Sequence, residues 1–322
     1  MILPSVGPDS LAPATRPTLY FIGVTTGGSS IQTVFPRWAA ELGLDDAVLQ
    51  GVDLPVHARA EDYRRVVRFL MEDPLSLGAL VTTHKIDLFR AAADLFDVVD
   101  PLARLMGETS CISKSEGRLV CHAKDPISSG LALDAFLPEG VWSTSGADAV
   151  LLGAGGSSIA IAWYLSRPGR GADRPGRIVV TNRSPGRLDS LRRVLGEFDT
   201  EIRFELVHAP TPADNDRLVE AAPPGSLVVN ATGLGKDAPG SPLTDAARFP
   251  RDGYAWDLNY RGRLVFLEQA RAQAAMAGLT VEDGWTYFLH GWTQVIAEVF
   301  HIAIPPRGPS FDRLSELARS TR

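Results

Sequence analysis

The sequence of 322 residues has little of several features that mark large classes of proteins. It contains two cysteines, six histidines and no apolar run of the roughly eighteen residues that a membrane span requires. The cysteines and histidines show no CxxC or HxxxH spacing, so we predict neither a metal site nor membrane association. The net charge is −6, from 38 acidic and 32 basic residues, and no basic stripe is present. We therefore do not expect nucleic acid as a partner.

The scarcity of cysteine also bears on the compartment. Cys111 and Cys121 flank a predicted hairpin at 112–120, where a disulfide is geometrically conceivable. Two thiols in a chain of this length fit a reducing cytosol better, and we expect a cytoplasmic protein. Residues 1–17 lack the charged start and apolar block of a secretory signal, and we expect a loose tail there.

The composition, with 45% hydrophobic and 22% charged residues, is that of a folded globular protein, and the length suggests two domains. Strand and helix patterns alternate in the amino-terminal part. Strands are predicted at 18–24, 47–54 and 77–85, and helices at 33–42, 61–72 and 87–96. This alternation predicts a parallel or mixed sheet.

A strand that ends at Leu152 is followed by a cluster of small residues and then by a helix-compatible run. The cluster consists of Gly153, Ala154, Gly155, Gly156 and Ser157. Gly153 permits a sharp turn, Gly155 lets a pyrophosphate approach the backbone, and the helix N-terminus supplies amide donors. The segment therefore predicts a dinucleotide site, although a tight turn in any α/β protein has similar residues.

A second strand follows after the length of one βαβ unit and ends in Asn182, Arg183 and Ser184. At this point an acidic residue would bond the free ribose hydroxyl of NAD. None is present, and Arg183 with Arg187 could clamp a 2′-phosphate instead. We predict NADP as the cofactor, with NAD as the alternative. The two arginines are otherwise solvated charges at a helix start.

Two further strands are predicted at 226–230 and 254–258, and small or polar residues end both. These residues are Asn230, Ala231, Thr232, Asn259 and Tyr260. Strands that end in this way build a crevice at their carboxyl ends. Beyond Tyr260 the pattern predicts helices to the end of the chain, at 264–276, 286–300 and 311–320.

Together these elements predict an α/β protein with two domains. Residues 127–281 form a Rossmann-like dinucleotide-binding domain. It is inserted into a discontinuous α/β substrate domain made of residues 1–126 and 282–322.

The ordered motifs resemble those of the shikimate dehydrogenase family from Tyr20 to about Ile302. The family's GAGGA, NRT and NATxxG motifs match well at Gly153, Asn182 and Asn230. The resemblance implies a substrate domain of shikimate dehydrogenase type. It also implies NADP-dependent interconversion of a ring hydroxyl and a ketone on shikimate.

The same resemblance implies that Lys85 and Asp125 are catalytic. Residues 81–85, VTTHK, resemble the family's VTxPxK segment, one residue shorter and without its proline. Residues 123–125, AKD, keep only the aspartate of its NTD segment. A lysine can take the hydroxyl proton as hydride leaves, and a carboxylate can orient both groups. The alternatives are an ordinary exposed lysine and a helix N-cap before Pro126.

The resemblance also implies a set of substrate-binding residues, which are Ser29, Thr82, Ser110, Tyr260 and Gln294. As alternatives, Ser29 and Thr82 satisfy turn backbone, and Tyr260 packs at the domain junction.

Three positions depart from the family pattern for the substrate. Ile31 stands at the second of two serines, Ser110 replaces an asparagine, and Gly291 falls at a glutamine. His290 or Gln294 supplies a polar group near that last position, unless either lies on the helix surface.

These departures favour a close analogue of shikimate as the alternative substrate, such as quinate or aminoshikimate. We expect a small cyclic polyol or hydroxy acid as the ligand and a monomer or homodimer as the assembly. A non-catalytic homologue that senses a ligand is the alternative of another class. The presence of both Lys85 and Asp125 argues against it.

Overall fold

The computed structural model describes residues 3–236 and 238–319. The chain forms two compact units, of which the first comprises Met1–Lys124 and Gly291–Arg322 and the second Asp125–His290. The second unit is thus inserted into the sequence of the first.

The first unit is built on a six-stranded mixed sheet with the order β2-β1-β3-β5-β6-β4. Its strands are β1 (Thr18–Gly23), β2 (Val48–Asp53), β3 (Ser76–Val81), β4 (Val98–Val99), β5 (Cys111–Ser115) and β6 (Arg118–His122). β1 pairs in parallel with β2 and β3, whereas β5 runs antiparallel to both of its neighbours. The carboxyl ends of β1, β2 and β3 therefore lie at the same end of the sheet.

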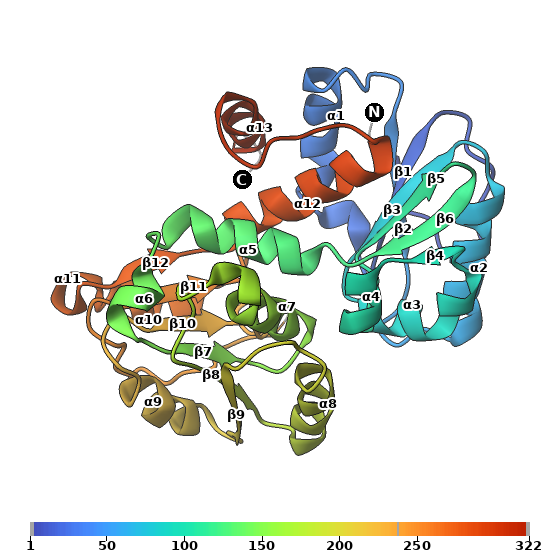
Figure 1. The fold of residues 1–322 in the computed structure, drawn as a ribbon. Helices are drawn as coiled ribbons and strands as arrows, with labels where there is room; N and C mark the ends of the chain where they lie inside the picture. The colour runs from blue at the N-terminus through green and yellow to red at the C-terminus, as the bar shows by residue number, and fades with distance from the viewer. Residues whose placement is uncertain (1–2, 237, 320–322) are drawn as a thin grey trace. The chain divides into compact units, whose positions relative to one another are not determined.

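Two neighbouring aromatic residues of β1 show how helices cover both faces of this sheet. The helices of the unit are α1 (Ile31–Glu41), α2 (Ala60–Glu72), α3 (Lys85–Ala92), α4 (Pro101–Met106), α13 (Pro309–Arg319) and the later part of α12 (Trp285–Phe300). The ring of Tyr20 lies 5.5 Å from that of Phe69 in α2, and the ring of Phe21 lies 5.0 Å from that of Trp292 in α12. Because successive side chains of a strand point to opposite faces, α2 and α12 cover opposite faces (Figure 1).

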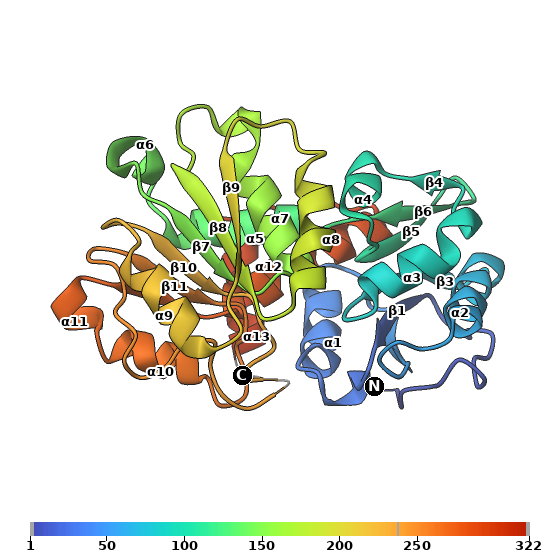
Figure 2. The ribbon, with the colours of Figure 1, turned by 90° about the horizontal axis from the view of Figure 1, so that it is seen from below.

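The second unit contains a six-stranded parallel sheet with the order β12-β11-β10-β7-β8-β9. Its strands are β7 (Ala149–Leu152), β8 (Arg177–Asn182), β9 (Arg203–His208), β10 (Leu227–Asn230), β11 (Tyr254–Asp257) and β12 (Thr280–Glu282). Figure 2 shows β7, β8, β10 and β11 running side by side. This is the strand order of a Rossmann fold, which reverses between β7 and β10. The predicted α/β class with a Rossmann-like domain is confirmed.

Helices cover both faces of this second sheet as well. They are α5 (Asp125–Phe136), α6 (Val141–Ser145), α7 (Gly156–Ser166), α8 (Pro185–Leu195), α9 (Pro212–Glu220), α10 (Val265–Arg271), α11 (Ala274–Ala277) and the start of α12. Val219 of α9 and Phe266 of α10 share one core cluster with Val150 and Val228 of the sheet. On the opposite face, Phe136 of α5 lies 5.8 Å from Trp256 (Figure 1).

Two strands of this sheet were not predicted. β9 precedes the segment that we expected to be the third strand, and β12 interrupts the region that we expected to be entirely helical. Both are edge strands, and β9 is half-exposed and carries Arg203, Glu205 and His208. Edge strands lack the continuous apolar run that identifies a buried strand, which is why the pattern missed them.

The second boundary between the units also differs from the expected position at 281/282, because it lies within α12. Tyr287, near the start of that helix, has its ring 5.9 Å from Trp256 of β11. The first turns of α12 therefore belong to the core of the second unit, and the remainder belongs to the first.

The predicted hairpin is present as β5 and β6, and both cysteines are buried free thiols. Cys111 lies opposite His122, and Ile112 lies opposite Cys121. The two cysteines therefore point to opposite faces of the sheet, and a disulfide cannot form in this register. Burial raises the pKa of the Cys121 thiol to about 12.

Candidate functional site

A pocket of about 390 Å³ opens at the carboxyl ends of the central strands of the second unit. Its lining comes from the segments that follow β7, β8, β9 and β10. Eight of the predicted cofactor residues line it: Gly153, Ala154, Gly155, Asn182, Arg183, Arg187, Ala231 and Thr232. The pocket lies where the strand order reverses, which is the position at which doubly wound α/β sheets bind ligands.

The glycine turn after β7 has the geometry that its sequence suggests. Gly153 has a φ of 112°, and a Cβ atom there would lie 2.9 Å from the carbonyl oxygen of Ala231. Gly155 immediately precedes α7, and a Cβ atom built on it meets no atom within 4 Å. Gly153 is therefore needed for the turn itself, whereas the open space at Gly155 leaves the start of the helix accessible to a ligand.

Two basic side chains stand at the pocket edge beyond β8. Arg183 and Arg187 are both exposed, and among the described residues neither guanidinium is paired with a carboxylate. The side-chain oxygen of Asn182 accepts a hydrogen bond from the Ser184 amide at 2.8 Å, which turns the chain into α8. The two cations are thus available to an anionic ligand.

A buried hydrogen-bond network shapes the wall of the pocket after β10. The side chain of Asn230 donates to the Asp257 carboxylate at 3.1 Å and accepts from the Thr232 hydroxyl at 2.6 Å. The same carboxylate accepts from the backbone and side-chain amides of Asn259 at 2.9 and 2.8 Å. Burial raises the pKa of Asp257 to about 6, against the lowering effect of these donors. The network holds the loop that carries Thr232.

Four predicted cofactor residues are not among those that line the pocket, namely Gly156, Ser157, Ser184 and Asn230. The first two begin α7, Ser184 occupies the N-cap position of α8 without a capping hydrogen bond from its side chain, and Asn230 is fully buried in the network just described. The segment after β9, from Ala209 to Pro212, does line the pocket and was not predicted. The sequence of this segment contains small residues and prolines. They could not be interpreted as a turn at the end of a strand, because β9 itself was not predicted.

In the first unit, an unusually tight turn links β3 to α3. The carbonyl oxygen of Thr82 accepts from the His84 amide at 2.5 Å, and Thr83 between them has a φ of 60°. A β-branched residue at positive φ is strained, and such strain clusters at functional sites. The shortened VTTHK segment therefore closes as a three-residue turn, which makes Lys85 the first residue of α3.

Ser29, Thr82 and Lys85 all follow the carboxyl ends of β1 and β3, which are neighbours in the sheet. The Thr82 amide donates to the Ile22 carbonyl at 2.9 Å, and the Lys85 carbonyl accepts from the Thr109 amide at 3.1 Å. The structure thus gathers these predicted residues at one end of the first sheet.

Ser110 lies next to the same turn, but its hydroxyl already has a partner. The side chain is buried, and its oxygen accepts from the Lys124 amide at 2.6 Å. Ile31 is fully buried as well, whereas Ser29 and Ser30 are half-exposed at the start of α1. Ser30 was not predicted, although it directly follows Ser29.

The remaining predicted residues are distributed over both units. Asp125 is the buried first residue of α5 in the second unit, and its carbonyl accepts from the Ser129 hydroxyl at 2.7 Å. Tyr260, in the same unit, packs its ring 4.9 Å from that of Phe288. Gln294 belongs to the first unit and lies on α12, two residues after Trp292.

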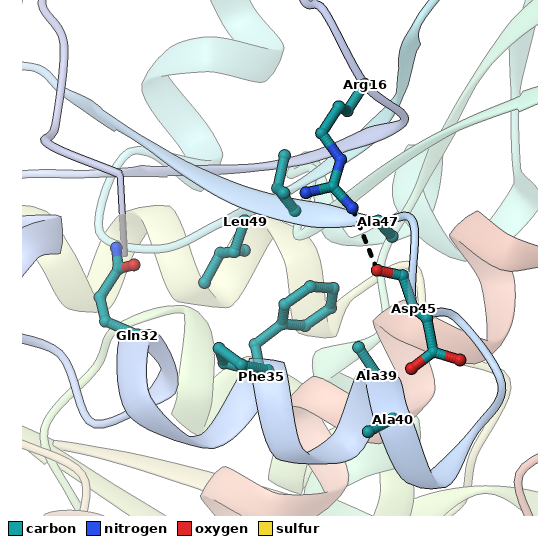
Figure 3. Close-up of a pocket in the computed structure, with 10 residues that line it drawn as sticks. Arg16, Gln32, Phe35, Ala39, Ala40, Asp45, Ala47 and Leu49 are labelled. Atoms are coloured by element: carbon teal, nitrogen blue, oxygen red, sulfur yellow. Dashed lines mark hydrogen bonds between the residues drawn. The ribbon is translucent and has the colours of Figure 1, made fainter. Parts of the chain in front are cut away.

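A smaller pocket of about 110 Å³ lies beside α1 and β2 in the first unit (Figure 3). Its lining includes Phe35 and Leu49, and the Arg16 guanidinium at its rim donates to the Asp45 carbonyl at 3.1 Å. None of the predicted site residues lines it.

The described residues contain neither a candidate metal site nor a candidate membrane span. Within 3–236 and 238–319, no group of three or more His, Cys, Asp or Glu side chains has the arrangement of a metal site. Across the same ranges, none of the helices has both the length and the apolar character needed to span a bilayer.

Known proteins that resemble this chain are found by sequence and by structure. No protein-family model matches the chain. Shikimate dehydrogenase (NADP(+)) of Symbiobacterium thermophilum is 31% identical over 218 residues, which cover 67% of this chain and 68% of the relative.

Solved structures agree with this relationship. Shikimate 5-dehydrogenase from Thermus thermophilus, in complex with NADP(H) and shikimate, has a TM-score of 0.68 and 26% identity, covering 95% of this chain and 99% of its own. Quinate dehydrogenase from Corynebacterium glutamicum, in complex with NAD, has a TM-score of 0.72 at 20% identity over 95% of this chain and 99% of its own, which is a likeness of fold. From its sequence identity and its two α/β units, this chain belongs to the shikimate dehydrogenase family.

Proposed function

We propose that this chain is an NADP-dependent oxidoreductase that interconverts a ring hydroxyl and a ketone on shikimate or a close analogue. The observation that carries the proposal is the pocket of the second unit, where a glycine turn, a helix N-terminus and two exposed arginines occur together. Relatives named as NADP-dependent shikimate dehydrogenases support the same activity.

The residues of this pocket fit a dinucleotide with a 2′-phosphate. A pyrophosphate needs open backbone amides, and the space at Gly155 before α7 provides access to them. A 2′-phosphate needs cations, which Arg183 and Arg187 supply. Within the described part of the chain, no acidic side chain lines this pocket to bind a free ribose hydroxyl, so the fit favours NADP over NAD.

When bound, the nicotinamide of NADP accepts or returns a hydride, and the chain has to manage the accompanying proton. We assign that proton to Lys85, which takes it from the substrate hydroxyl. We propose Asp125 as the second catalytic residue, with the role of orienting the hydroxyl. The strained turn at Thr83 fixes the backbone from which Lys85 projects, so that little freedom is lost when substrate binds.

The substrate requires polar partners for a carboxylate and for ring hydroxyls. The hydroxyls of Ser29 and Thr82 bind its carboxylate or ring hydroxyls, and Tyr260 and Gln294 complete the contacts. Ile31 and Ser110 are both buried. At these two positions, where the family pattern has a serine and an asparagine, the chain thus presents no solvent-accessible polar side chain. This observation favours an analogue such as quinate or aminoshikimate as the second candidate.

The test is reduction of NADP by the purified protein with shikimate, quinate and aminoshikimate in parallel. Wild type should turn over at least one of them, and Lys85→Ala should lose at least about a hundredfold in kcat, as expected for loss of a general base. NADP affinity, followed by fluorescence titration, should not change in this variant. The matched control is Lys114→Ala, a lysine of the same unit whose ammonium donates to the Asp73 carbonyl at 2.6 Å.

The outcomes separate the alternatives. Turnover by Lys85→Ala at the wild-type rate would refute the catalytic role of this lysine. Activity on quinate or aminoshikimate alone would identify the analogue as the substrate. A wild-type protein that binds NADP and ring compounds without turnover would instead be the ligand-sensing homologue.

A further inference from the structure

A cluster of charged side chains in the first unit lies outside the set of residues proposed to bind or react with the ligands. Lys124 forms an ion pair with Glu298 of α12, with its nitrogen 2.5 Å from the carboxylate. The other oxygen of Glu298 lies 3.4 Å from His122. The opposite side of that imidazole faces Asp100, with 3.7 Å between nitrogen and oxygen.

Lys124 is held at both of its ends. Its amide donates to the Ser110 hydroxyl at 2.6 Å, and its ammonium bonds to Glu298. The side chains of the pair are only 20% and 29% exposed, so the attraction is screened less than that of a surface pair. Although burial raises the pKa of Glu298, the hydrogen bond from Lys124 and nearby cations lower it below its usual range.

His122 and Asp100 in turn hold the Glu298 carboxylate in position. The imidazole of His122 also bonds to the Ser113 hydroxyl at 2.9 Å, which sets the plane of the ring. Asp100 is fixed because its carboxylate accepts from the Leu102 amide at 2.6 Å and caps α4. The partner of Lys124 therefore has a defined position of its own.

The position of Lys124 in the sequence connects this cluster to a proposed catalytic residue. It directly precedes Asp125, and the chain passes from the first unit to the second between these two residues. It stands where the NTD segment of the resemblance has a threonine, so the chain has here a long cation that needs a carboxylate partner. Any freedom of the Lys124 backbone is passed to the next residue through the peptide bond.

We infer that Ser110 and Glu298 are positioning residues for Asp125, which they hold in place by fixing Lys124 through its amide and its ammonium. This inference rests on the proposed function, because it takes Asp125 as a catalytic residue. Ser110 thereby acts through the backbone of Lys124.

The first test is a double-mutant cycle on Lys124→Met and Glu298→Gln, which remove the charges and keep most of the volume. Each single variant should lower kcat by about tenfold or more, with a smaller change in KM and none in NADP affinity, because a misplaced catalytic group affects the chemical step. The double variant should be no slower than the slower single variant, because both changes remove one interaction. Lys124→Arg should keep most of the activity.

The matched control is Glu316→Gln on α13, which breaks the Arg313–Glu316 pair of the same unit and should leave kcat unchanged. Multiplied losses in the double variant, or a fall in thermal stability without a change in kcat, would overturn the inference.

A second measurement keeps the inference separate from the proposed activity. Hydrogen exchange of the Lys124 amide and of the first turn of α5 should accelerate in Ser110→Ala and Glu298→Gln, whereas exchange around the pocket turn after β7 should not. Unchanged exchange at Lys124 would refute the positioning role even if the protein oxidised no ring alcohol. Faster exchange in a protein without such activity would support the positioning role and contradict the proposed function alone.

Discussion

At the scale of single residues, the molecule depends on a few side chains whose environment differs strongly from water. Asp257 is fully buried at the end of β11 and accepts hydrogen bonds from the side chains of Asn230 and Asn259. Arg183 and Arg187, by contrast, are charged side chains that are exposed at the pocket edge. We expect the first environment to make stability depend on pH, and we propose that the second selects the cofactor.

The pH dependence has a definite sign. Burial raises the pKa of Asp257 to about 6, with a further rise from Asp283, so the folded state holds this proton more tightly than the unfolded chain. Its contribution to stability is full below the unfolded pKa and is lost as the pH rises through about 6. Between about pH 4.5 and 7.5, the free energy of unfolding of Asp257→Asn should rise by about 2 kcal/mol relative to wild type.

Urea unfolding of both proteins at the two pH values measures this difference. Asp189→Asn, which changes a carboxylate that is 69% exposed, is the control and should show no such trend. A difference between wild type and Asp257→Asn that is independent of pH would contradict the assignment.

The cofactor preference should depend on the arginines. Arg183→Ala and Arg187→Ala should each weaken NADP binding about tenfold or more, because a charge-assisted hydrogen bond contributes about 1.5–3 kcal/mol. NAD binding should change little. Titration of both nucleotides measures the effect, with Arg193→Ala of α8 as the control, since that guanidinium donates to Ser190 and does not line the pocket. Equal losses for the two nucleotides would argue against a 2′-phosphate site.

At the scale of elements, two turns decide where functional groups lie. The turn after β7 contains Gly153 at positive φ, and the turn after β3 contains Thr83 at positive φ. Only the first has a residue suited to that conformation. The second stores strain at Thr83, two residues before Lys85, which is the pattern expected where geometry has to be held.

The glycine turn should separate folding from binding. Gly153→Ala should destabilise the protein by about 1–3 kcal/mol, because it forces a Cβ atom into a strained conformation against the Ala231 carbonyl. Gly155 has a φ of −101°, and a Cβ atom built on it meets no atom within 4 Å. The Gly155→Ala variant should therefore fold normally and lose NADP affinity. Urea unfolding and NADP titration of both variants give the comparison. Normal NADP binding by Gly155→Ala would remove this turn from the binding site.

At the strained turn after β3, a substitution to glycine should stabilise the protein. Thr83→Gly relieves a positive φ and should stabilise the protein by about 1 kcal/mol, while kcat falls because the backbone before Lys85 gains freedom. Thermal unfolding and steady-state kinetics measure the two effects. Thr25→Gly is the control for stability, because its φ of −145° already suits threonine and glycine should destabilise it. A Thr83→Gly variant that is both less stable and fully active would show that the turn has no such role.

At the scale of the whole molecule, the chain passes from one unit to the other twice, after Lys124 and within α12. The residues proposed to bind NADP lie in the second unit. Ser29, Thr82 and Lys85 lie in the first. Binding of each ligand should therefore protect a different part of the chain.

Hydrogen exchange of the full chain tests this division. Saturating NADP should slow exchange in the turns after β7, β8 and β10 and should stabilise the protein by about 2.7 kcal/mol at a hundredfold excess over Kd. It should leave β1 to β6 nearly unaffected. The substrate alone should slow exchange at the start of α1 and around Lys85. Protection by NADP confined to the first unit would contradict the proposed site.

The α/β class and the Rossmann-like domain could be predicted from the sequence alone, as could eight of the residues that line the pocket of the second unit. Local signals sufficed for these features, because a buried strand followed by Gly153 and a helix has a short-range pattern that any context preserves. The edge strands β9 and β12 were missed, because their half-exposed residues carry no apolar run. The pocket segment from Ala209 to Pro212 was missed with them.

Interactions between residues that are distant in the sequence are visible only in the three-dimensional structure. Lys124 and Glu298 are 174 positions apart, and no pattern in either segment indicates that they form a pair. The same holds for Ser110, where the resemblance suggested a substrate contact and the fold placed the hydroxyl on the Lys124 amide. Spacing along the chain predicts which residues share an element, whereas ion pairs and buried hydrogen bonds depend on how the elements pack.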